Sequence, residues 1–158
     1  MSESAETASS TIRNPRAGLL AWLLPGLGHA MLGDRRRGML AGGGVIGLFL
    51  LGILIGGIDV VDRREDGLWF VAQAGAGPIA WVADAANAAL VANGRFGGMI
   101  EAPHPNPMAP PDAVVMVPAF KGVAHPNEMG TLFCAMAGLM NVFLVIDAMS
   151  RRPAGAAP

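Results

Sequence analysis

Residues 38–58 read GMLAGGGVIGLFLLGILIGGI without one charged side chain, and residues 130–149 read GTLFCAMAGLMNVFLVIDAM with Asp147 as the only charge. The hydrocarbon core of a bilayer is about 30 Å thick, so a helix crosses it in about 20 apolar residues. Both stretches reach that length. A buried helix of a soluble protein usually keeps a polar stripe, which neither stretch has. We therefore expect two transmembrane helices, at 38–58 and 130–149.

The composition of the whole chain agrees with this expectation. Of the 158 residues, 53% are hydrophobic and only 15% are charged, against about 25% charged in ordinary soluble domains. The formal net charge is -1, which excludes an electrostatic nucleic-acid binder because no basic surplus exists to neutralise phosphates. The single cysteine excludes an internal disulfide framework.

Two further apolar segments are less regular. Residues 17–32 contain Pro25-Gly26 at their middle and measure about 24 Å as a straight helix, which makes them either a short kinked span or a re-entrant hairpin. Residues 68–92 contain Asp84, which is costly at mid-bilayer, and a Gly77-Pro78 pair near their centre. For this segment a helix packed in the bundle and an interfacial helix fit equally well.

The remaining segments are polar or rich in proline. Residues 1–16 are predicted to be a disordered leader, and residues 150–158 a flexible tail that follows the last span. Prolines are too dense for a helix in residues 94–127, which predicts an extended, polyproline-like connection outside the hydrocarbon. The predicted fold class is therefore an all-α, multi-pass transmembrane bundle with a membrane domain at 17–149.

The distribution of basic residues depends on how the irregular segments cross. If all four segments span, the two sides of the membrane hold six and five basic residues, and the positive-inside rule then gives no orientation. If 17–32 is re-entrant and 68–92 does not span, the split becomes seven against four. The larger group is then Arg13, Arg16, Arg35, Arg36, Arg37, Arg151 and Arg152.

Small residues recur on one face of each predicted span. Such faces let helix backbones approach closely, and an asparagine among them can donate a hydrogen bond to a neighbouring helix. The predicted helix-packing residues are Gly38, Gly42, Gly52, Gly56, Gly130, Ala137 and Asn141.

A few ionisable residues are candidates for lipid or functional contacts. Arg35, Arg36 and Arg37 lie before the first span, where basic side chains bind anionic headgroups. Intramembrane ionisable residues are functional candidates by default, which singles out His29, Asp84 and Asp147.

Motifs for catalysis are missing from the sequence. It contains no phosphate-binding loop, dinucleotide fingerprint, nucleophile elbow or zinc-protease pattern. The repeated tripeptides His104-Pro105-Asn106 and His125-Pro126-Asn127 match no short zinc motif. We therefore predict no catalytic residue, no cofactor and no metal.

Three blocks of the sequence resemble a known family. They resemble small uncharacterised bacterial integral-membrane proteins that share a domain of unknown function. The three blocks are RNPRAGLLAWLLPGLGHAMLGDRRRGML (13–40), FVAQAGAGPIAWVADAAN (70–87) and HPNEMGTLFCAMAGLMNVFLVIDA (125–148). The Pro-Gly-Leu-Gly-His entry motif is also distantly similar to the two-transmembrane-helix domain family. The resemblance implies a multi-pass protein of the bacterial cytoplasmic membrane and transfers no catalytic residue.

Three functions remain open at this level. The first is a structural or interaction role through glycine-faced helices, with membrane lipids and another membrane protein or a second copy as partners. The second is a transport or ion-handling subunit that uses the intramembrane polar residues. The third is a membrane enzyme with a metal site at His104 and His125, which requires both imidazoles to lie close together.

Overall fold

The computed structural model describes residues 14–104, 106–121 and 125–151. The predicted leader lies outside these ranges except for residues 14–16, and the predicted tail lies outside them except for residues 150 and 151.

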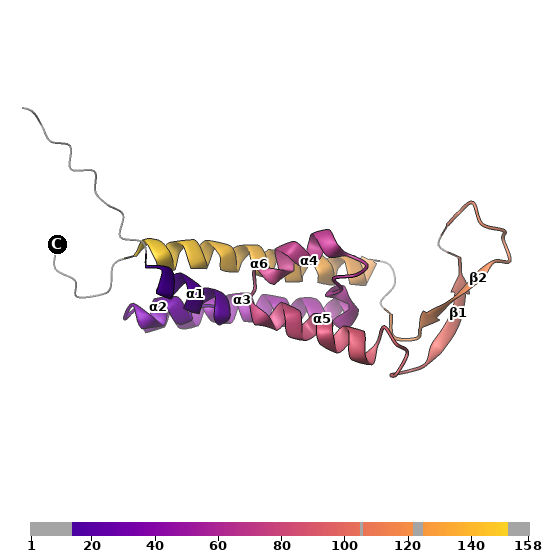
Figure 1. Ribbon diagram of the computed structural model, residues 1–158, viewed down its shortest axis with the longest axis horizontal. Coiled ribbons are helices and arrows are strands. Elements are labelled where there is room, and N and C mark those ends of the chain that lie inside the picture. Colours follow the sequence, from indigo (N-terminus) through magenta and orange to yellow (C-terminus); the bar gives the residue numbers. More distant parts are fainter. Residues whose placement is uncertain (1–13, 105, 122–124, 152–158) are drawn as a thin grey trace, which may run out of the picture.

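Two long antiparallel helices form the frame of the bundle: α3 (Arg35–Gly56) and α6 (His125–Ser150) (Figure 1). Asp34 starts α3, because its carboxylate accepts the backbone N–H of Arg37 at 3.2 Å. The two backbones approach closely where small residues meet. A Cβ added to Gly52 would lie 2.7 Å from the carbonyl oxygen of Gly130. Both helices are long and apolar enough to cross a membrane.

The first irregular segment is a helical hairpin, one of the two forms that its sequence leaves open. It consists of α1 (Pro15–Leu23) and α2 (Leu27–Met31). The backbone N–H of Asn14 donates to Met149 at 2.8 Å, and His29 of α2 lies beside Asp147, so the chain enters the bundle and returns to the same end. Gly26 makes the turn with φ +87°, and its Cα lies so near α3 that an added Cβ would be 2.0 Å from the oxygen of Gly38.

A second helical hairpin enters from the opposite end. After a short 3₁₀ turn, η1 (Ile58–Val60), the chain forms α4 (Gly67–Ala74) and α5 (Pro78–Leu90). The expectation of one helix across 68–92 is wrong. Gly77 has φ +92° and Pro78 occupies the first turn of α5, so the chain reverses between the two helices.

The connection 94–127 contains a β-hairpin, which corrects both the all-α class and the polyproline-like prediction. Strands β1 (Met99–Pro103) and β2 (Val114–Pro118) pair antiparallel, with Ile100 opposite Val117 and Pro103 opposite Val114. The run of valines favours a strand. The prolines inside the two strands lie at their ends, where the loss of an N–H donor disturbs the ladder least.

Two clusters of apolar side chains form the core of the bundle, beside a few buried polar residues. Its main cluster places Val45 and Phe49 of α3 against Val60, Phe70 and Ala80, and it continues along α6 through Cys134 and Ala137. A smaller cluster joins Ala17, Ala21 and Ala148 at the end where α1 begins. Large apolar side chains cover the outside, including Leu54, Leu68 and Phe143.

The observed boundaries extend both predicted spans. α3 begins at Arg35 rather than residue 38, because the Asp34 cap draws the three arginines into its first turn. α6 begins at His125 rather than residue 130, with Glu128 in its first turn, where a carboxylate favours the helix dipole.

Candidate functional site

The polar side chains inside the bundle lie at three levels along α6. One level is at Asp147, the second at Asn141, and the third around Asn127. Asn127 and Asp147 are separated by about 30 Å of helix at 1.5 Å per residue. This separation equals the thickness of a bilayer's hydrocarbon core.

The first level is the Asp147 cluster, formed by His29, Arg37, Asp147 and Arg151. His29 Nε2 donates to Asp147 Oδ2 at 2.8 Å, and the same oxygen lies 3.0 Å from Arg151 Nε and 3.1 Å from a terminal nitrogen of Arg37. His29 is fully buried, whereas the carboxylate is partly exposed. The cluster therefore ties α2, α3 and α6 together at one end and leaves an excess of positive charge there.

The second level is the tip junction, where the turns of the two helical hairpins meet. Asn141 Nδ2 donates to the carbonyl oxygens of Ala21 at 3.3 Å and Gly75 at 2.9 Å. Trp22 Nε1 donates to the carbonyl oxygen of Ala74 at 3.2 Å. The last carbonyls of a helix have no partner within it, so these side chains supply the donors that the broken backbone lacks.

Close packing fixes the tip junction as well. A Cβ on Gly77 would lie 2.0 Å from the carbonyl oxygen of Trp22, and one on Gly138 would lie 2.0 Å from that of Ala72. Buried backbone without regular helical bonding is stable only where other groups of the protein satisfy or cover it. Asn141 and the glycines provide that cover.

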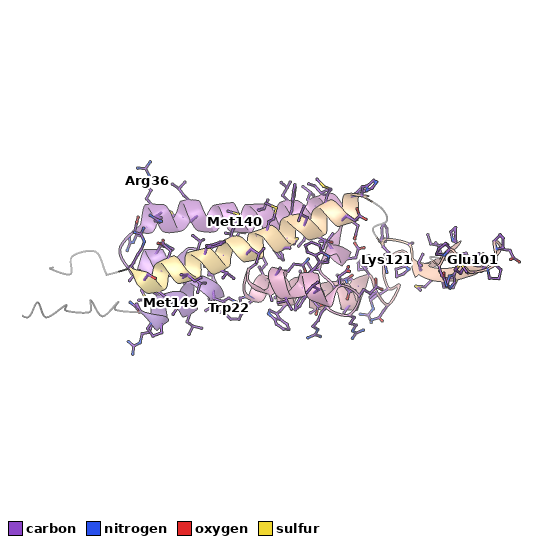
Figure 2. The ribbon with its side chains drawn as sticks, turned by 90° about the horizontal axis from the view of Figure 1, so that it is seen from above. Trp22, Arg36, Glu101, Lys121, Met140 and Met149 are labelled. Carbon is purple, nitrogen blue, oxygen red and sulfur yellow. The ribbon has the colours of Figure 1, made fainter. Side chains whose placement is uncertain are left out.

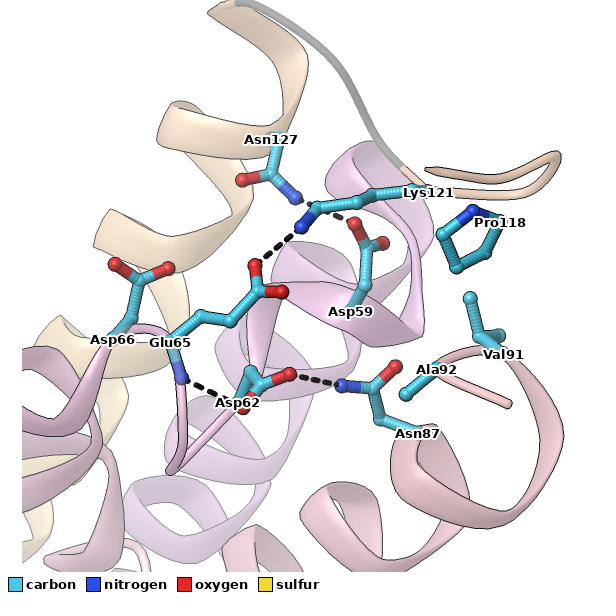
Figure 3. Close-up of a pocket in the computed structure, with 10 residues that line it drawn as sticks. All are labelled: Asp59, Asp62, Glu65, Asp66, Asn87, Val91, Ala92, Pro118, Lys121 and Asn127. Atoms are coloured by element: carbon cyan, nitrogen blue, oxygen red, sulfur yellow. Dashed lines mark hydrogen bonds and ion pairs between the residues drawn. The ribbon is translucent and has the colours of Figure 1, made fainter. Parts of the chain in front are cut away.

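The third level is an acidic pocket of about 70 Å³ at the opposite end (Figure 3). Asn127 Nδ2 donates to Asp59 Oδ2 at 3.1 Å, Asn87 Nδ2 donates to Asp62 Oδ2 at 3.0 Å, and Lys121 pairs with Glu65. The pocket is lined by Asp59, Asp62, Glu65, Asp66, Asn87, Val91, Ala92, Pro118, Lys121 and Asn127. With four carboxylates and one lysine among its lining residues, it is electronegative.

Asp84 lies at this end and not in the middle of the bundle. Its Oδ1 accepts the backbone N–H of Arg63 at 2.9 Å, and its Oδ2 lies 3.6 Å from Arg63 Nε. The hairpin turn before α5 carries residue 84 back to the level of residue 63.

The predicted packing glycines of α3 face two different partners. Gly38 and Gly42 contact the turn of the first helical hairpin, since a Cβ on Gly42 would lie 2.1 Å from the oxygen of Pro25. Gly52 and Gly56 contact α6 instead, near Gly130. Ala137 and Asn141 are buried on α6.

The predicted headgroup arginines divide into two kinds. Arg37 joins the Asp147 cluster. Arg35 and Arg36 are exposed and form no ion pair with any described residue. Figure 2 places Arg36 at the end of the molecule opposite to Lys121 and Glu101.

The two histidines proposed for a metal site have separate local partners. His104 Nδ1 accepts the N–H of Asn106 at 3.1 Å, beside the β-hairpin turn, and His125 Nδ1 lies 3.3 Å from Glu128 on α6. Among the described residues, no three His, Cys, Asp or Glu side chains are arranged to hold a metal ion.

Several structural contacts escape a reading of the sequence. Gln73 is fully buried and donates to Val60 at 2.8 Å, and Asp62 accepts the backbone N–H groups of Arg64 and Glu65. Gln73 stands two residues before the Gly75 turn, and Trp22 stands three before Pro25. A polar group next to a helix break is the signal that points to them.

Comparison with known proteins places the chain in a family. A family of unknown function, DUF6677, matches residues 16–157. The chain belongs to this family. The match agrees with the expected membership of an uncharacterised family, and the DUF6677 description assigns no activity. No curated protein and no solved structure matches the chain.

Proposed function

We propose that this DUF6677 protein is a small multi-pass protein of the bacterial cytoplasmic membrane that binds a partner protein through its β-hairpin. In this proposal α3 and α6 cross the bilayer, and the two helical hairpins enter it from opposite faces and meet at the tip junction. The role is interaction, without a catalytic step.

The exposed apolar belt supports the membrane location. The most apolar 18-residue windows of α3 and α6 are only 28% and 39% buried inside the protein. A core helix of a soluble protein would be mostly buried. Leu54, Leu68, Val71 and Phe143 are each more than 70% exposed, and in water such a belt would be an aggregation site. Hydrocarbon is the solvent that suits it.

The charges at the two ends support an orientation. Arg16, Arg35, Arg36, Arg37 and Arg151 lie at the end where α1 begins and α6 finishes, whereas Arg63, Arg64, Arg95 and Lys121 lie at the other. Arg13 and Arg152 directly flank residues 14 and 151 in the sequence and belong to the first group, so the split is seven against four. Cytoplasmic segments carry the excess of basic residues. The Asp147 cluster is therefore assigned to the cytoplasmic side, and the acidic pocket and β-hairpin to the opposite side.

The β-hairpin carries the proposal of an interaction role. It projects beyond the helices (Figure 1), and apart from Pro118, which lines the acidic pocket, its strands mainly contact each other. A two-stranded hairpin is marginally stable by itself, and its outer edges are free to pair with another strand. Ile100, Ala102, Val115 and Val117 share one apolar face, on which Ile100 is half exposed and the other three are partly exposed. A partner strand or apolar surface would complete this face by β-augmentation.

The transport alternative has less support. A transport path requires polar side chains to converge on one site, as in transporters with broken helices. His29 and Asp147 lie at one end, Asp84 lies at the other, and Asn141 bonds to backbone between them. The polar side chains of each level therefore bond to their own neighbours and do not converge on one shared site.

Photo-cross-linking in living cells tests the interaction. A photoreactive residue at Ile100 should give one discrete cross-linked product, whose mass identifies either a second protein or a second copy. The matched control is the same residue at Asn93, which is exposed but lies outside the strands. Equal labelling at both positions, or no discrete product at Ile100, would contradict the proposal.

A further inference from the structure

An apolar groove runs along α3 beside the first helical hairpin. Its volume is about 200 Å³, and its wall is made almost entirely of carbon atoms. The turn at Pro25-Gly26 forms one side, and Gly38, Met39, Gly42, Gly43 and Ile46 of α3 form the other. The groove is open at Gly43, where no atom lies within 4 Å of an added Cβ, whereas Gly42 packs directly against the carbonyl oxygen of Pro25.

Arg35 lies on the same face of α3 as the groove. The lining positions 38, 39, 42, 43 and 46 follow residue 35 at intervals of three, four, seven, eight and eleven. Residues at these intervals lie above one another on a helix. Residue 35 therefore lies about one turn before the groove on the same face of α3, at the end of the groove nearer the basic end of the bundle.

This arginine has no internal counter-charge among the described residues. Asp147 is shared by His29, Arg37 and Arg151, and Asp34 uses its carboxylate to cap α3. Arg36 is one residue further round the helix and is also without an ion pair in the described chain. An anion at the end of the groove would meet one or two free guanidinium groups and the N-terminal dipole of a 22-residue helix.

We propose that this groove binds one phospholipid with an anionic headgroup. The phosphate pairs with Arg35 and is assisted by Arg36, and one acyl chain lies along Gly43 against Ile46. Charge complementarity selects the headgroup, and the apolar wall accepts the hydrocarbon. The proposal rests on the membrane location proposed above, which puts the groove at the depth of lipid acyl chains.

The adjacent glycines of α3 offer a matched pair of variants. Neither Gly43 nor Gly44 has any atom within 4 Å of an added Cβ, so both positions accept a side chain. Gly43 lines the groove, and Gly44 does not. Gly43→Leu therefore fills the groove, while Gly44→Leu adds the same side chain to the same helix outside it. Arg35→Gln and Arg95→Gln form a second pair, because Arg95 lies at the other end of the molecule.

The test is native mass spectrometry of the full chain in detergent, titrated with phosphatidylglycerol, phosphatidylcholine or inorganic phosphate. The wild type should retain one phosphatidylglycerol in preference to phosphatidylcholine. Arg35→Gln should weaken binding about fivefold, the effect of one basic residue near a lipid surface. Gly43→Leu should weaken it at least as much, whereas Gly44→Leu and Arg95→Gln should bind as the wild type does.

Three results would overturn the proposal: equal retention of both lipids, equal loss in Gly43→Leu and Gly44→Leu, or equally tight binding of inorganic phosphate. Flotation with vesicles of phosphatidylcholine separates this failure from failure of the membrane location. A protein that floats with the vesicles but shows no lipid preference contradicts only the lipid site. A protein that does not float contradicts both.

Discussion

Replacing Asn141 by leucine tests whether the tip junction holds the two helical hairpins. The leucine has a comparable volume but no hydrogen-bond donor, so both bonds from Asn141 Nδ2 disappear. The carbonyl oxygens of Ala21 and Gly75 then remain buried without that donor.

The size of the effect follows from the two bonds. Hydrogen bonds between membrane helices are worth about 0.6 kcal/mol on average and about 1.7 kcal/mol at most. Asn141→Leu should therefore lower the free energy of unfolding by about 1 to 3 kcal/mol, with the bond at 2.9 Å to Gly75 contributing more than the one at 3.3 Å.

Unfolding of the full chain in mixed micelles, followed by circular dichroism, measures the free energy. Hydrogen exchange of the backbone amides around Gly26 and Gly77 reports on the turns themselves, and both should exchange faster in the variant. Met140→Leu is the control, since Met140 is the neighbouring exposed side chain (labelled in Figure 2). A change below about 0.5 kcal/mol with unaltered exchange at both turns would refute the role given to Asn141.

Three further variants test other contacts. Gly42→Ala should destabilise the protein by about 1 to 3 kcal/mol because its Cβ meets the oxygen of Pro25. Gly44→Ala should stabilise it by up to about 1 kcal/mol. Shifts of the same sign in both unfolding curves would contradict the close packing of Gly42. Asp147→Asn should lower the free energy of unfolding by about 1 kcal/mol or more, because a fully buried His29 loses a charged partner. The control Glu65→Gln, which breaks an exposed ion pair, should lower it by less. The reverse order would be evidence against the Asp147 cluster. Val117→Thr should change the unfolding free energy by less than about 0.5 kcal/mol but reduce cross-linking at Ile100, so retention of the full cross-link would argue against the apolar face.

The long helices could be predicted because their signal is local. About twenty consecutive, predominantly apolar residues predict a long helix from local sequence alone, and both α3 and α6 occupy the expected regions. The first and last turns were missed because caps decide them. Asp34 draws Arg35 into the helix, and no hydrophobicity pattern contains that information.

The helical hairpins were only partly predictable. Pro25-Gly26 and Gly77-Pro78 mark breaks, but a break alone does not say whether the chain continues forward or reverses. Reversal depends on donors supplied from elsewhere, such as Asn141, which is 120 residues from Ala21. The β-hairpin was missed for a similar reason. The many prolines of 94–127 suggest an extended connection when the composition is considered as a whole. The pairing of Ile100 with Val117 depends instead on the order of individual residues along the two strands.

The sites depend on the same long-range pairing. His29 and Asp147 were both singled out as polar residues in apolar surroundings, but nothing local pairs them across 118 positions. Asp84 lies near the middle of residues 68–92, so a single helix there would carry the carboxylate far from either end. The reversal at Gly77 moves it to the acidic end, next to Arg63.

The most direct test of the membrane arrangement is cysteine labelling in intact spheroplasts with a maleimide that cannot cross the membrane. Cys134 is fully buried, so the wild type serves as the unlabelled background. Met108→Cys and Arg64→Cys should be labelled in intact spheroplasts, whereas Arg16→Cys, Arg36→Cys and Ser150→Cys should be labelled only after lysis. Labelling of positions 16 and 36 from opposite sides would show that residues 17–32 cross the membrane, which would contradict the paired re-entrant hairpins.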